Sequence, residues 1–101
     1  MINAPIAVIA FKRPDHLKVM LESLSNNKGF NDSNLYIFLD GPKTENDKSG
    51  HLETVAVAKN FEHKNKEVII RDKNLGNKKN VIFSVTEVLK KHDRVICLED
   101  D

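Results

Sequence analysis

The 101-residue sequence lacks several features that would assign it to a specialised class of protein. It has no tryptophan and a single cysteine, Cys97. No apolar run approaches the about 20 residues of a membrane span. One cysteine excludes a disulfide framework within the chain and fits a reducing compartment. Because the first residues also lack the basic and apolar stretches of a signal peptide, we expect a cytoplasmic location.

The sequence also lacks an excess of either charge. Its 16 lysine and arginine residues nearly balance 15 aspartate and glutamate residues, so the net charge is +1. Without a strong positive field, no nucleic-acid partner is expected. The composition, 40% hydrophobic and 31% charged, is that of an ordinary globular chain, and residues 1–101 are expected to form one domain. Function should therefore depend on a local site.

Short apolar segments alternate with stretches of helical periodicity. The apolar segments have the composition of strands buried on both faces and cover residues 6–11, 35–39, 68–70 and 95–98. Three helices are expected. The first begins at Pro14, the second covers residues 49–60 with Ser49 as a candidate N-cap, and the third covers residues 76–91. The order βαβαβαβ predicts an α/β fold, in which helices flank a parallel sheet and the crossovers are right-handed.

The strand order 3-2-1-4 follows if the first three strands add in one direction and the fourth returns beside the first. Ligands of open α/β sheets bind at such a switch point, outside the carboxyl ends of the strands. Basic residues follow the first strand and acids follow the second and fourth. These residues are Lys12 and Arg13, then Asp40, then Glu99, Asp100 and Asp101. A cationic and an acidic corner are expected to face one cleft.

The acids Glu99, Asp100 and Asp101 directly follow the last apolar segment. At an effective dielectric constant of about 20, two unit charges about 4 Å apart repel by roughly 4 kcal/mol, which favours a bound cation. Carboxylate oxygens suit Mg²⁺ or Mn²⁺ rather than zinc. The planar guanidinium of Arg13 suits a phosphate group. The pattern therefore predicts a metal-bound nucleoside diphosphate.

Four landmarks occur in order along the chain. They are the segment PIAVIAFKRP at 5–14, Asp40, the triplet Asn74-Leu75-Gly76, and the segment LEDD at 98–101. Together they resemble the bacterial glycosyltransferases with the GT-A fold, family 2-like, and the related N-acetylglucosaminyltransferase I type. The resemblance spans the whole chain. It implies the Rossmann-like, donor-binding half of a GT-A fold.

The resemblance also implies roles for individual residues. Arg13 would contact the nucleotide and Asp40 the nucleobase. Glu99 and Asp100 would position the ribose and the water molecules of the metal, and Asp101 would bind the metal as the last residue of a DxD-type motif. The implied activity is a metal-dependent glycosyltransferase of the hexosyltransferase type. It would transfer a sugar from a nucleotide sugar, most simply UDP-linked, to a glycan acceptor in polysaccharide biosynthesis.

The sequence departs from that family in its length. Family members continue past the acidic motif into an acceptor-binding half that carries the catalytic base, so no catalytic residue is assigned within residues 1–101. The resemblance implies that this part is inactive alone. It also implies that the last strand has an unprotected edge, through which a homodimer is expected.

Two other protein classes share part of this sequence pattern. A haloacid dehalogenase-type phosphatase needs a carboxylate nucleophile where Phe38 stands, so that reading fails. A receiver-like or nucleotide-binding regulatory module, binding Mg²⁺ without catalysis, remains open because Asp72 follows the third strand. Against it, Phe11 and Lys12 replace the acidic pair that receivers carry after the first strand.

Overall fold

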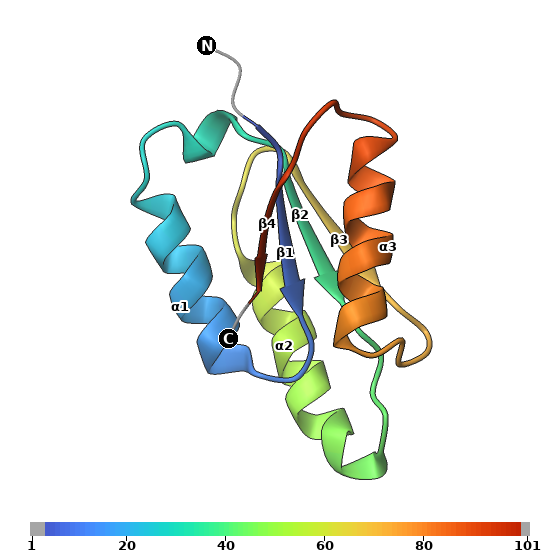
Figure 1. Ribbon diagram of the computed structural model, residues 1–101. Coiled ribbons are helices and arrows are strands. Elements are labelled where there is room, and N and C mark those ends of the chain that lie inside the picture. Colours follow the sequence, from blue (N-terminus) through green and yellow to red (C-terminus); the bar gives the residue numbers. More distant parts are fainter. Residues whose placement is uncertain (1–3, 100–101) are drawn as a thin grey trace.

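The computed structural model describes residues 4–99 and has a central sheet of four parallel strands. The strands are β1 (Ile6–Ala10), β2 (Leu35–Leu39), β3 (Lys66–Ile70) and β4 (Ile96–Glu99). Their order in the sheet is β3-β2-β1-β4, and all four point the same way (Figure 1). The predicted α/β fold and the predicted strand order 3-2-1-4 are therefore confirmed.

Three α-helices connect the strands and pack on both faces of the sheet (Figure 1). Helices α1 (Pro14–Ser25) and α2 (Lys48–Asn60) cover one face, and α3 (Asn77–Leu89) covers the other. Two short 3-10 turns, η1 (Phe30–Asp32) and η2 (Glu45–Asp47), precede β2 and α2. Within residues 4–99, no helix is both long enough and apolar enough to span a membrane.

The two central strands form the core. Val8 and Ile37 pack under α1 and α2, whereas Ile9 and Phe38 pack under α3, and all four are buried. The prediction of strands buried on both faces is thus correct for β1 and β2. It is wrong for β3 and β4, which are edge strands of the described sheet and are only partly buried, with Ile96 48% exposed.

Several element ends differ from the predicted ones. Strand β1 stops at Ala10, and β4 includes Glu99. Helix α2 begins at Lys48 with Asp47 as its N-cap residue, so the assignment of Ser49 as N-cap is wrong. The cause is the preceding turn η2, which already has helical backbone geometry and moves the start of the helix toward the N-terminus.

Candidate functional site

The carboxyl ends of β1, β2 and β4 lie side by side at one edge of the sheet. Ala10 is opposite Leu39, and Ile9 is opposite Glu99. The amide of Asp40 donates to the carbonyl of Ala10 over 3.0 Å, so the β1–β2 ladder extends one residue past β2. The residues that follow these strands therefore emerge together at the switch point between β1 and β4, where ligands bind in sheets of this kind.

Arg13 lies at this edge as the N-cap residue of α1. Its carbonyl accepts the amide of Leu17 over 3.1 Å. Pro14 occupies the first turn, where its missing N–H is not needed. The Arg13 side chain is exposed. A cationic group is thus held at the predicted edge by a well-defined backbone.

Glu99, the first acid of the predicted cluster, ends β4 and is exposed. It shares the α3 face of the sheet with its register partner Ile9. The Nδ2 of Asn77, the first residue of α3, donates to Glu99 Oε1 over 2.7 Å. Glu99 is therefore tied to the start of α3. Asp100 and Asp101, the other two predicted acids, lie outside the described residues.

Only part of the predicted cation site lies among the described residues. Within residues 4–99, no group of three His, Cys, Asp or Glu side chains is arranged to hold a metal ion. The Glu99 carboxylate at the edge is a hard oxygen donor, which fits Mg²⁺ or Mn²⁺ rather than a softer metal. The assigned ligand, Asp101, is outside the described range.

Asp40 is buried, with an exposed fraction of 3%. Its Oδ1 accepts the amides of Gly41 at 2.9 Å and Leu75 at 2.7 Å. Its Oδ2 accepts the amide of Gly76 at 3.0 Å and Asn74 Nδ2 at 3.3 Å. A carboxylate has about four lone-pair positions. The Asp40 carboxylate is therefore fully used in ordering the loop that follows β3.

The same loop is held by further contacts. Asn74 Nδ2 also donates to the carbonyl of Gly41 over 2.8 Å. A Cβ at Gly41 would lie 2.7 Å from the backbone carbon of Lys73, so glycine permits the two loops to touch. Gly76 adopts φ of +84° just before α3, and apart from its chain neighbours no described residue has an atom within 4 Å of a Cβ placed there. The loop after β3 therefore packs closely on the loop after β2.

Lys12, the other basic residue after β1, is engaged in an ion pair. Its Nζ lies 2.6 Å from Oδ1 of Asp47, which is 7% exposed. Asp47 Oδ2 accepts the amides of Lys43 at 3.2 Å and Thr44 at 3.1 Å. The hydrogen bond from Lys12 is the main reason that the pKa of Asp47 falls to about 2. Asp47 thus joins the loops after β1 and β2.

Sequence reasoning did not identify Asp47, although a local signal exists. The spacing Thr44-x-x-Asp47 is similar to a capping box, in which the acid at the third helical position accepts the amide of the N-cap residue. That pattern indicates a helix start but not the contact with Lys12, which lies 35 positions away in the sequence.

Arg71 is a second residue whose role was not predicted from the sequence. Its Nε donates to Asn80 Oδ1 at 3.2 Å, and its two terminal nitrogens contact Ser84 Oγ at 3.1 Å and Glu87 Oε1 at 3.0 Å. Its guanidinium carbon also lies 5.3 Å from the centre of the Phe38 ring. Arg71 therefore holds α3 against the sheet. Lys73, Lys78 and Lys79, by contrast, are exposed around the site edge.

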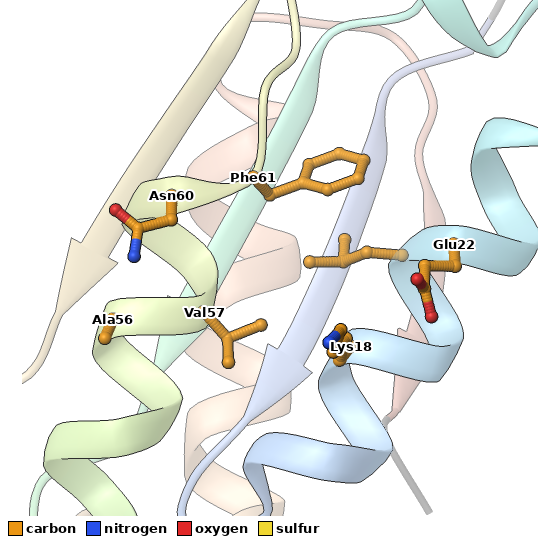
Figure 2. Close-up of a pocket in the computed structure, with 7 residues that line it drawn as sticks. Lys18, Glu22, Ala56, Val57, Asn60 and Phe61 are labelled. Carbon is orange, nitrogen blue, oxygen red and sulfur yellow. The ribbon is translucent and has the colours of Figure 1, made fainter.

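An apolar groove between α1 and α2 lies apart from this edge (Figure 2). Lys18 and Glu22 come from α1, and the opposite wall ends at Phe61, just after the C-terminus of α2. The N-terminus of α2, in contrast, adjoins the Lys12–Asp47 pair. The groove shares none of the residues assigned to the predicted site.

Comparison with protein-family models gives no match, and comparison with curated proteins gives none either.

Proposed function

We propose that this chain is the donor-binding region of a metal-dependent glycosyltransferase. It binds a nucleotide sugar, most simply a UDP-sugar, for transfer of the sugar to a glycan acceptor. Arg13, Asp40, Glu99 and Asp100 belong to the nucleotide site, Asp40 through the loop that its carboxylate orders, and Asp101 is the metal ligand. The catalytic base and the acceptor site are not assigned to residues 1–101.

One observation carries this proposal. Arg13 and Glu99 emerge from β1 and β4, the neighbouring strands that form the switch point of the sheet. A basic and an acidic group at adjacent strand ends suit a ligand with phosphate oxygens and a divalent cation. The ordered landmarks from residue 5 to residue 101 support the same function by their resemblance to GT-A glycosyltransferases.

The chemistry assigned to this region is electrostatic. The Arg13 guanidinium pairs with nucleotide phosphate oxygens through charge-assisted hydrogen bonds. Glu99 and Asp100 orient the ribose and the waters of the cation. Asp101 would hold Mn²⁺ or Mg²⁺, which would supply positive charge to offset the negative charge that develops on the diphosphate as the sugar departs.

The test is calorimetric titration of UDP, GDP and CMP into the chain, with and without Mn²⁺. UDP is expected to bind more tightly with Mn²⁺ than without it. Arg13→Ala should weaken UDP binding by about tenfold to a hundredfold, because a hydrogen bond to a charged group contributes about 1.5–3 kcal/mol. Asp101→Asn should remove the Mn²⁺-dependent part of the affinity.

Two exposed residues distant from the carboxyl edge provide matched controls. Lys28→Ala and Asp93→Asn remove the same charges from loops at the opposite end of the sheet and should leave UDP binding unchanged. The proposal is wrong if no nucleotide binds, with or without Mn²⁺. It is also contradicted if beryllofluoride with Mg²⁺ orders the chain while UDP has no effect, as expected of a receiver-like module.

A further inference from the structure

Four consecutive residues connect the end of β2 with the end of β4. We call them the 74–77 segment: Asn74, Leu75, Gly76 and Asn77. The first three donate hydrogen bonds to the Asp40 carboxylate, at distances from 2.7 to 3.3 Å. The fourth donates to Glu99 Oε1 at 2.7 Å. Because β1 lies between β2 and β4, these hydrogen bonds link the two strands on either side of β1.

The two ends of this connection differ in burial. Asp40 is 3% exposed and has its four lone-pair positions engaged, whereas Asn77 and Glu99 are exposed. A nucleobase N–H could bind Asp40 only by sharing an oxygen that already accepts two hydrogen bonds or by displacing a donor. Displacing Leu75 or Gly76 would leave a backbone amide without its hydrogen bond, which is unfavourable.

We propose that Asp40 is a positioning residue, which sets the place of Glu99 through the 74–77 segment. This role rests on the proposed function. As a positioning residue, Asp40 does not select the nucleobase through its carboxylate. Its hydrogen bonds hold Leu75 and Gly76, the backbone of Gly76 starts α3, and Asn77 then orients Glu99 at the metal-binding end of the site.

The segment provides a direct test because its exposed end can be changed without disturbing the buried end. Asn77→Ala removes the hydrogen bond to Glu99, and Lys78→Ala is the matched control in the same exposed turn of α3. Asp40→Asn alters the buried end, since its amide nitrogen would face amide donors. UDP, GDP and CMP affinities are measured for each protein, with and without Mn²⁺.

Asn77→Ala and Asp40→Asn should each reduce the Mn²⁺-dependent gain in UDP affinity by about tenfold. This is the lower end of the loss in metal affinity that is typical when a residue orienting a metal ligand is changed. The ratio of UDP to GDP to CMP affinity should not change. Lys78→Ala should leave the gain intact. Asn77→Gln should recover part of it, because the longer amide can still donate to Glu99.

Specific results would overturn this role. A changed base preference in Asp40→Asn with an unchanged Mn²⁺-dependent gain would show that Asp40 contacts the base. An unchanged gain in Asn77→Ala would show that the segment does not position Glu99, even if Asp40→Asn failed to fold. Absence of nucleotide binding by the unaltered chain would instead overturn the proposed function and this role with it.

Amide hydrogen exchange, measured without nucleotide, tests the hydrogen bonds of the 74–77 segment separately from their effect on nucleotide binding. Asp40→Asn should accelerate exchange at Leu75 and Gly76, and Asn77→Ala should leave both rates unchanged. Unchanged exchange in Asp40→Asn would contradict the hydrogen bonds on which the role depends.

Discussion

Lys12 and Asp47 form an ion pair whose Nζ–Oδ1 distance is 2.6 Å, and it joins the loop after β1 to the start of α2. The contact is reinforced at the backbone, because a Cβ at Gly50 would lie only 2.6 Å from the Lys12 carbonyl oxygen. The next residue, Arg13, caps α1. Contacts with α2 and the turn before it therefore hold the backbone next to Arg13, the residue that is proposed to bind the phosphate.

The first prediction concerns the stability that Asp47 provides at neutral pH. Asp47→Asn should lower the melting temperature, because the amide loses the charged hydrogen bond to Lys12 and weakens those to Lys43 and Thr44. Thermal unfolding followed by circular dichroism measures the change. Glu45→Gln breaks the exposed pair with Lys48 and should have little effect. Equal shifts for the two variants would contradict this account.

The second prediction is the pH dependence of that effect. The pKa of Asp47 is lowered from 3.8 to about 2, chiefly by the hydrogen bond from Lys12. The folded state therefore binds a proton less readily than the unfolded state. The stabilisation should be complete above about pH 4 and should be lost as the pH falls toward 2. Urea unfolding of the wild type and of Asp47→Asn should show a free-energy difference that narrows over this interval.

The third prediction compares two glycines whose constraints differ. Gly41→Ala should destabilise the fold by about 1–3 kcal/mol, because its Cβ would lie 2.7 Å from the Lys73 backbone, which cannot move aside easily. Gly76→Ala meets no other described residue beyond its chain neighbours and should cost about 1–3 kcal/mol through its backbone alone, because φ of +84° with ψ of +151° is a region that side chains rarely adopt. Urea denaturation measures both. A neutral Gly41→Ala would contradict the close approach of the two loops.

Much of the architecture could be predicted from the sequence because its signals are local. Apolar segments separated by helical stretches specify parallel strands, and the positions directly after the strands specify what meets at the carboxyl edge. Arg13, Asp40 and Glu99 reach that edge for this reason. The polar start of β3 was not predicted, because an edge strand does not need an apolar residue at every position.

Other features depend on contacts between distant residues and give little local signal. Lys66 Nζ donates to the carbonyls of Ala58, Lys59 and Phe61 at 2.7 to 2.9 Å, which satisfies the C-terminus of α2. Burial in this position lowers the pKa of Lys66. In the sequence, this lysine looks like any other polar loop residue. Its role, like that of Arg71, exists only once the helix and strand have packed together.

The fourth prediction concerns Arg71 and the attachment of α3. Arg71→Ala should destabilise the protein by roughly 2 kcal/mol or more, because Asn80 and Ser84 are buried and would lose hydrogen bonds. Exchange of α3 amides should accelerate more than that of α1 amides. Lys90→Ala, at the exposed end of α3, is the control. Uniform acceleration in both helices would argue against a specific anchor.

The fifth prediction is self-association through β4. Strand β4 pairs with β1 on one side and has no second strand partner within the described residues. Its exposed Ile96 makes that edge apolar, and a strand edge of this kind can pair with a second copy. Sedimentation should therefore detect a dimer that increases with concentration. Ile96→Lys should shift the equilibrium to monomer, because a charged residue on an edge opposes pairing.

Leu52 offers a matched control for this experiment. It is 68% exposed, more than the 48% of Ile96, but lies on helix α2 rather than on a strand edge. If backbone pairing of β4 drives association, Leu52→Lys should leave the dimer intact, whereas Ile96→Lys removes it. If exposed apolar area alone drives association, Leu52→Lys should have the larger effect. A strictly monomeric wild type at high concentration would contradict both explanations.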